Sequence, residues 1–182
     1  MSDNSIRMAT ESGPTQGASS GEVSRFLSFR LDRDDYAIPL LRVKEVIALP
    51  ELTPVPQTPP HFLGIMNLRG QIISVVDLRL KLNLLAENNE DTCVVICDLA
   101  PYVLGVVVSS VTNVLALTPD EIGPRPEVHG TSTEYVLGVA KLENSLVLIL
   151  DLAAALGGED QLTIQRTNST TNNSNTGRED AA

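Results

Sequence analysis

Two aspartates occupy matching points of the chain and could act as paired carboxylates. Asp77 and Asp151 each follow an apolar, β-branched run, and two such groups can serve as general acid and general base. Each also precedes a short run of helix-forming residues, "LRLKL" and "LAAAL". An aspartate that accepts hydrogen bonds from the free N–H groups at the start of a short helix explains both positions equally well. We therefore predict two structural N-caps, far apart, and no catalytic residue.

The other reactive side chains form no catalytic or metal-binding pattern. His61 and His129 lie in Pro- and Gly-rich connections without Cys, Asp or Glu at ligand spacing, so we expect solvent-exposed loop histidines. The sequence "GASSG" at 17–21 matches the nucleophile pattern GxSxG, but no strand precedes it. The acidic stretch "DRDD" lacks the longer ligand-rich loop that calcium requires and is typical of a hairpin turn. We expect neither a metal site nor a cofactor.

Charge and cysteine content restrict the partners and the compartment. The formal charge of -10 and the pI near 4.5 argue against nucleic-acid binding, which needs clustered Lys and Arg. The chain has no basic amphipathic stretch and no apolar run of about 18 residues, so we expect no membrane insertion. Cys93 and Cys97 lie in one apolar run and indicate two reduced, buried thiols of a cytosolic protein. A metal or redox pair is the less favoured alternative.

Residues 23–156 carry the periodic apolar content. Short runs of Val, Ile and Leu, broken by Gly, Pro, Asn and Asp, are typical of an all-β domain. The segments 1–22 and 157–182 are rich in Ser, Gly, Thr and Asn, and we predict two disordered tails. Between two strands, Thr58 and Pro59 suggest the start of a short helix, which Gly64 would end as a C-cap.

The folded region contains an internal repeat. "GIMNLRGQIISVVDLRLKL" at 64–82 aligns without gaps with "GVAKLENSLVLILDLAAAL" at 138–156, and "VKEVIAL" at 43–49 aligns with "VTNVLAL" at 111–117. The chain is thus predicted to be a duplicated unit of about five strands, with a boundary near 85–92. A half of this size makes a marginal core alone, so we expect the halves to share an interface.

Arg69 departs from the repeat, because its counterpart is Glu143. The alternation of a strand places Leu41, Val43 and Glu45 on one face, as an apolar strip that ends in a carboxylate. We hypothesise that Arg69 pairs with Glu45 at the edge of this strip. The alternative is a solvated turn arginine with no partner.

Four segments together resemble the bacterial CheW family of chemotaxis coupling proteins. They are "FLSFRLDRDDYAIPLLRVKEVI", "TPPHFLGIMNLRGQIISVVDLRLKL", "LGVVVSSVTNVLAL" and "STEYVLGVAKLENSLVLILDL", and the match covers residues 24–156 in order. The resemblance implies two SH3-like five-stranded β-barrels with short helices, and it leaves open an exchange of strands between them. It also implies a non-enzymatic adaptor that links the cytoplasmic tips of chemoreceptors to the regulatory domain of the histidine kinase CheA.

The resemblance further implies a cytoplasmic protein recruited to membrane-associated receptor arrays. The resemblance assigns no individual residues to the contact with the kinase. A paralogous adaptor of another chemosensory pathway, such as pilus-based motility, remains an alternative. A small-molecule enzyme or sensor is a distant one, and would need His61, Asp77 and Arg69 to line one deep pocket. By motif, the receptor-facing groove would involve Ile38, Val43, Glu45, Asn67, Arg69 and Gly105.

Overall fold

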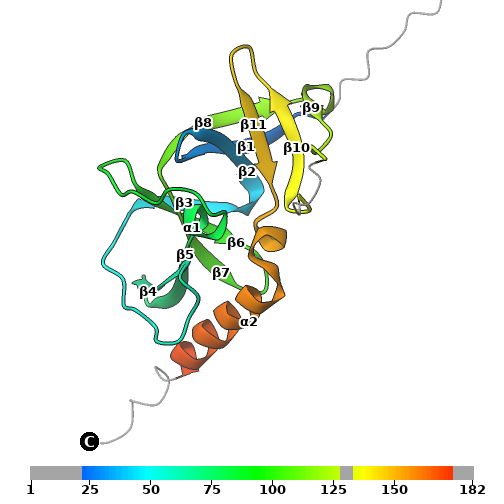
Figure 1. The fold of residues 1–182 in the computed structure, drawn as a ribbon. Coiled ribbons are helices and arrows are strands. Elements are labelled where there is room, and N and C mark those ends of the chain that lie inside the picture. Colours follow the sequence, from blue (N-terminus) through cyan, green and yellow to red (C-terminus); the bar gives the residue numbers. More distant parts are fainter. Residues whose placement is uncertain (1–21, 128–132, 174–182) are drawn as a thin grey trace, which may run out of the picture.

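The computed structural model describes residues 22–127 and 133–173, and within these ranges the strands form two sheets (Figure 1). Sheet A has the order β8-β1-β2-β11-β10-β9, and sheet B the order β3-β6-β7-β5-β4. The strands of sheet A are β1 Ser24–Leu31, β2 Asp34–Pro39, β8 Ser110–Leu117, β9 Ile122–Gly123, β10 Val136–Lys141 and β11 Leu146–Leu150. Those of sheet B are β3 Val43–Ala48, β4 Phe62–Leu68, β5 Gln71–Asp77, β6 Cys93–Asp98 and β7 Val103–Val108. The helices are η1 Leu40–Arg42, α1 Leu78–Lys81, η2 Pro119–Glu121 and α2 Leu152–Asn173.

The halves of the sequence exchange strands, so the predicted boundary near 85–92 is wrong for the sheets. The hairpin β1–β2 of the first half lies in sheet A, and the hairpin β6–β7 of the second half lies in sheet B. The chain crosses between the sheets at η1, just before β3, and again between β7 and β8. The all-β fold is confirmed, and the exchange of strands, which the resemblance left open, is present. Residues 85–92 separate the two repeats but not the two sheets.

The repeat extends to individual backbone contacts. In the hairpins β4–β5 and β10–β11, a bulge occurs at the same point, before Gly64 and before Gly138. The amide of Asp77 donates to the carbonyl of His61 at 2.7 Å, and the amide of Asp151 donates to that of Tyr135 at 2.8 Å. β5 and β11 each pair in parallel with an exchanged strand, β7 and β2 respectively. The duplication predicted from the sequence is therefore a structural one.

Gly64 is not a helix C-cap, which corrects the prediction. It lies inside β4 with a φ of +143°, and an ideal Cβ would sit 2.3 Å from the Thr53 carbonyl oxygen. In the second half, a Cβ on Gly138 would sit 2.7 Å from the Gly123 carbonyl oxygen. The two repeated glycines thus allow a crossing segment to approach a strand closely. The expected helix after Thr58 is absent, since residues 58 and 59 have no regular structure and residues 60 and 61 form a turn before β4.

The largest apolar cluster lies between the two sheets. It joins Phe29 and Ile38 of sheet A to Leu104 and Val106 of sheet B, and all four are buried. Smaller clusters within the two sheets include Ala37 and Ile149 for A, and Ile73 and Val107 for B. The expectation of a shared interface is confirmed, because the cluster between the sheets is larger than either of the others.

The C-terminal segment corrects the second predicted tail. α2 continues through Asn173, with a kink at Gly157, and runs from the end of β11 along sheet B (Figure 1). The helix propensity of this segment is weak, and contacts with the rest of the chain offset it. Ile164, which is fully buried, makes such contacts. The predicted N-terminal tail, apart from residue 22, and residues 174–182 lie outside the described residues.

Candidate functional site

An exposed ion pair joins Arg69 and Glu45. Arg69 Nη1 donates to Glu45 Oε1 at 2.7 Å, and Arg69 Nη2 donates to Glu45 Oε2 at 2.8 Å. The hypothesis of this pair is confirmed, and the alternative of a solvated arginine is wrong. β3 and the hairpin β4–β5 lie toward opposite edges of sheet B, so the pair fastens the two sides of the sheet to each other.

The local backbone conformation orients the Arg69 side chain. Arg69 and Gly70 form the tight turn between β4 and β5, with φ values of 52° and 88°. The amide of Gly70 donates to Asn67 Oδ1 at 2.8 Å, which holds the turn closed. The Arg69 side chain is 75% exposed and that of Glu45 is 26% exposed. A bidentate pair in this setting fixes the direction of the guanidinium while leaving most of it accessible.

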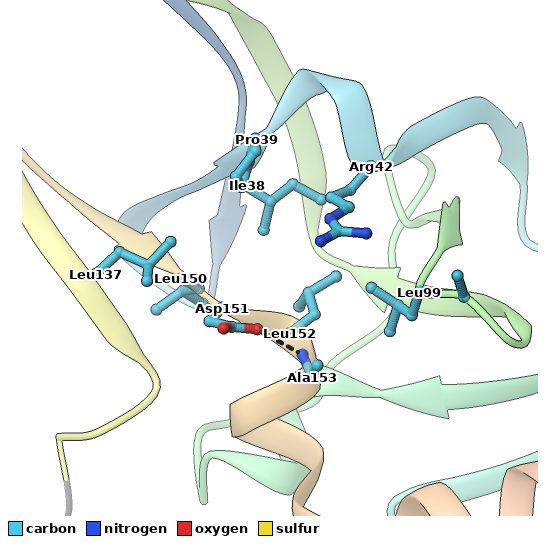
Figure 2. A pocket seen from close by; sticks show the side chains of 10 residues that line it. Ile38, Pro39, Arg42, Leu99, Leu137, Leu150, Asp151, Leu152 and Ala153 are labelled. Atoms are coloured by element: carbon cyan, nitrogen blue, oxygen red, sulfur yellow. Dashed lines mark hydrogen bonds between the residues drawn. The ribbon is translucent and has the colours of Figure 1, made fainter.

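A pocket of about 270 Å³ lies where the two sheets meet (Figure 2). Its walls are largely apolar, and Arg42 and Asp151 supply its charged groups. Figure 2 shows the Arg42 guanidinium on one side of the pocket, facing the start of α2. The lining residues are Ile38, Pro39, Arg42, Leu99, Ala100, Leu137, Leu150, Asp151, Leu152 and Ala153.

The pocket and the ion pair belong to one continuous stretch of chain. Arg42 ends η1 and Glu45 lies in β3, so about 10 Å of extended chain separates them. Val43 lies between them and is half-buried against the central apolar cluster. Leu41 in η1 is 98% exposed, and Leu137 at the pocket is 53% exposed. Exposed leucines beside an apolar pocket are a feature of protein-docking surfaces.

Two of the predicted docking residues are buried. Ile38 is 1% exposed and lines the pocket from β2. Gly105 lies in the middle of β7, where an ideal Cβ would sit 2.9 Å from Val94 Cγ1 and 3.2 Å from Val75 Cγ2. The structure therefore brings Asn67, Arg69 and Glu45 together at the surface, and it places Gly105 inside sheet B as a packing residue.

Both aspartates cap helices, as predicted. Asp77 accepts a hydrogen bond from the Arg79 amide at 2.9 Å, and Asp151 accepts from the amides of Ala153 and Ala154 at 2.9 and 3.2 Å. The fold buries a second partner of Asp77 that the sequence analysis missed. Arg79 is 1% exposed, and its Nη2 and Nε donate to the two oxygens of Asp77 at 2.8 and 3.0 Å.

Arg79 also organises the connection between the two repeats. Its Nη1 donates to the Glu87 carbonyl at 2.8 Å, and its Nη2 donates to Asn88 Oδ1 at 2.7 Å. The counterpart of Arg79 in the second repeat is Ala153, which lies in the longer helix α2. The sequence did carry a signal for Arg79. The two repeats match at the capping aspartate and at the leucine after it, and they differ at the next position, where Arg79 stands opposite Ala153.

His61 is not the solvent-exposed histidine that the sequence suggested. Its Nε2 lies 2.9 Å from Asp160 Oδ1, and Lys81 Nζ donates to Asp160 Oδ2 at 2.6 Å. His61 pairs with α2, Asp77 caps α1, and Arg69 lies at the opposite end of β5 from Asp77, about 20 Å away. The three residues do not line one pocket, so the arrangement that the enzyme alternative needs is not present. His129 lies outside the described residues.

The two cysteines are free thiols on β6. Cys97 is buried, and burial raises the pKa of its thiol to about 12. Burial also raises the pKa of the half-buried Cys93. Within residues 22–127 and 133–173, no three His, Cys, Asp or Glu side chains are grouped as metal ligands. No helix in these ranges is both long enough and apolar enough to cross a membrane.

Two sheets of exchanged strands, an apolar pocket at their junction and an exposed ion pair beside it define a protein-binding β-barrel scaffold. The family model of the CheW-like domain matches residues 25–159. The chain belongs to this family, and it is a non-enzymatic scaffold of chemotaxis signalling.

Two relatives and one solved structure show the extent of the similarity. The chain is 34% identical over 137 residues to the chemotaxis protein CheW of Klebsiella aerogenes, covering 74% of this chain and 82% of that one. It is 30% identical over 117 residues to protein FrzA of Myxococcus xanthus, covering 64% and 73%. The scaffolding protein TtCheW of Thermoanaerobacter tengcongensis has a similar structure, with a TM-score of 0.70 and 27% identity, covering 76% of this chain and 95% of that one.

Proposed function

We propose that this chain links the cytoplasmic tip of a chemoreceptor to the regulatory domain of the histidine kinase CheA, in the cytoplasm at membrane-associated receptor arrays. The observation that carries the proposal is the Arg69–Glu45 pair, which is exposed, bidentate and absent from the second repeat. An exposed pair contributes little to stability. Its role is therefore to orient a charged group toward a partner.

The receptor-facing surface runs from the pocket to the ion pair. The exposed Leu41 supplies apolar contact, Ile38 forms part of the pocket wall, and the half-buried Val43 lies between them and Glu45 on β3. Glu45 and Arg69 supply direction and charge at the far end. Asn67 holds the Arg69 turn, and Gly105 leaves room for the packing beneath Glu45. Apolar anchors with a charged rim are the usual composition of such interfaces.

The scaffold works by binding two partners at once. Holding the kinase and the receptor on one protein raises the concentration of each near the other. A signal then passes if the receptor state changes the free energy of the kinase state through the shared scaffold. This mechanism requires no chemistry on the adaptor.

A capture experiment tests the proposal. Purified receptor tip and purified CheA regulatory domain would each be captured on the wild type, on Arg69→Ala and on Val43→Asp. Glu143→Ala is the matched control, because Glu143 is exposed at the same turn of the second repeat. Circular dichroism confirms that each variant is folded. We expect receptor capture to fall at least tenfold for both test variants and to be unchanged for the control. Unchanged capture by folded Arg69→Ala would refute the assignment of this surface.

An adaptor of another chemosensory pathway is the second candidate. The similarity to protein FrzA, a relative with a different name, supports it. The same surface would then bind another receptor and another kinase. Co-purification of the tagged chain from its own cells, followed by identification of the bound kinase and receptor, distinguishes the two candidates.

A further inference from the structure

Helix α2 connects the two sheets. It begins directly after β11 of sheet A, and its later part contacts β5 of sheet B. Gly157, with a φ of +71° and a ψ of 172°, breaks the helix after the first turns. A Cβ at Gly157 or Gly158 would meet no atom within 4 Å, so the kink lies in open space. One side chain bridges it, because Gln161 Nε2 donates to the Ala153 carbonyl at 2.7 Å. Apart from this bridge, the part beyond Gly157 is held by contacts with the sheet B side of the molecule.

The first of these contacts is a buried carboxylate. Asp160 is 6% exposed, and its two oxygens bind His61 Nε2 at 2.9 Å and Lys81 Nζ at 2.6 Å. His61 precedes β4 and Lys81 ends α1, so both partners belong to the sheet B side of the molecule. A carboxylate buried at this depth depends on such partners, because burying it unpaired is costly.

Two further contacts lie on the same helix face. Ile164, one turn after Asp160, is fully buried in the central apolar cluster. Asn168, one turn later, accepts from the Ser74 amide and hydroxyl at 3.1 and 2.7 Å. Its Nδ2 donates to the Val103 carbonyl at 3.1 Å. Residues four apart share a helix face, so these three side chains form one line of attachment to sheet B.

The helix has little stability apart from this line. Its final part, "TNSTTNN", consists of residue types with low helix propensity. Leu162 is exposed on the other side of the helix. Segments held by few buried contacts open at lower free energy than the strands of the core.

Beneath the helix lies a surface next to the docking face. Gln165, Asn168 and Ser169 form one wall of a shallow pocket whose opposite wall includes Gln71 and Tyr102. Gln71 is two residues from Arg69 and begins β5. The C-terminal part of α2 therefore borders the turn that presents Arg69.

We propose that residues 158–173 of α2 form a releasable strap, with Asp160 as its lock and Gly157 as its hinge, which limits access to the surface beside Arg69. Release frees Ser74 of β5 and Tyr102, which directly precedes β7, and enlarges the face open to a partner. The strap itself rests on the structure alone. Its effect on binding rests on the proposed docking function of Arg69.

Hydrogen exchange of the full chain, followed by mass spectrometry, tests the strap. Asp160→Asn removes the charge that binds Lys81 and His61, and Asn168→Ala removes the second attachment. Glu159→Gln is the matched control, because Glu159 is adjacent and exposed. We expect exchange in residues 160–169 to be at least tenfold faster in Asp160→Asn and Asn168→Ala, with β7 and the amides of β5 other than Ser74 unchanged. Equal protection of these residues in Asp160→Asn, Asn168→Ala and Glu159→Gln would overturn the strap.

Capture of the receptor tip tests the effect on access. Asp160→Asn is expected to capture the tip at least threefold more strongly than Glu159→Gln, and the gain should vanish when Arg69→Ala is added. Faster exchange with unchanged capture would overturn the gating of the Arg69 face while leaving the strap in place. Loss of capture in Arg69→Ala alone is the separate test of the docking function.

Discussion

Arg69 and Glu45 lie 24 positions apart in the chain, yet their side chains meet in a bidentate pair with N–O distances of 2.7 and 2.8 Å. The pair joins the β4–β5 turn at one side of sheet B to β3 at the other. In the second repeat the position of Arg69 is held by Glu143, so the pair belongs to one half only. If the pair marks a docking surface, as we propose, this duplicated fold has one such surface and not two.

The Arg69–Glu45 pair should contribute little to folding. We expect Arg69→Ala and Glu45→Ala to lower the free energy of unfolding by roughly 0–1 kcal/mol each, because the guanidinium is largely exposed and screened. Urea denaturation of both single variants and of the double variant measures this as a cycle. A loss of several kcal/mol in either single variant would show that the pair is mainly structural.

Substitution of Gly64 by alanine should destabilise the fold far more than the same substitution at a glycine with free space around it. Gly64→Ala places a Cβ 2.3 Å from the Thr53 carbonyl oxygen, at a φ that side chains rarely adopt. We expect a loss of roughly 3 kcal/mol or more in the free energy of unfolding, because the backbone must shift. Gly158→Ala, whose Cβ meets nothing within 4 Å, is the control and should be neutral or stabilising. Equal unfolding midpoints for the two variants would contradict the close approach.

Arg79 should be one of the most sensitive positions in the fold. Arg79→Met removes the cation and leaves the carboxylate of Asp77 buried without its main partner. We expect a loss of about 3–5 kcal/mol, measured by thermal and urea unfolding. Arg42→Met, which changes an exposed arginine with no ion-pair partner within 4 Å among the described residues, should cost less than about 1 kcal/mol. Similar losses in both would contradict the role given to the buried pair.

Cys97 should make the fold sensitive to high pH. Burial raises the pKa of its thiol from 9.0 to about 12, so the folded state keeps the proton that the unfolded state loses. This contribution to stability is complete below pH 9 and declines as the pH rises toward 12. By pH 10.5 the loss is about 2 kcal/mol. The unfolding free energy of Cys97→Ala between pH 8 and 10.5 should therefore fall less than that of the wild type. The same decrease in unfolding free energy with pH in both proteins would refute this role of Cys97.

The repeat explains why much of the architecture could be predicted. Asp77 and Asp151 occupy equivalent positions, and a cap that is needed twice is easier to recognise than a residue that occurs once. The opposite argument identified Arg69, because an unequal pair in a duplicated chain marks a difference between the halves. Charge and strand alternation then suggested Glu45 as its partner, and the structure confirms the pair.

Other features depend on contacts between distant segments. Both repeats look alike locally whether or not they exchange hairpins, so the sequence left the exchange open. Gly64 fits a C-cap as well as a close approach until the position of Thr53 is known. Helix α2 has a composition typical of a disordered tail, and it is held by Asp160, Ile164 and Asn168, whose partners lie far away in the sequence.

The most direct test of the proposed docking role is a charge exchange across the Arg69–Glu45 pair, with receptor-tip binding measured by titration calorimetry. Arg69→Glu and Glu45→Arg would each place two like charges together, and the double variant would restore an opposite-charge pair in reversed order. We predict at least a tenfold weaker affinity for each single variant and partial recovery in the double variant. Single variants that stay folded and bind the tip as tightly as the wild type would contradict the account.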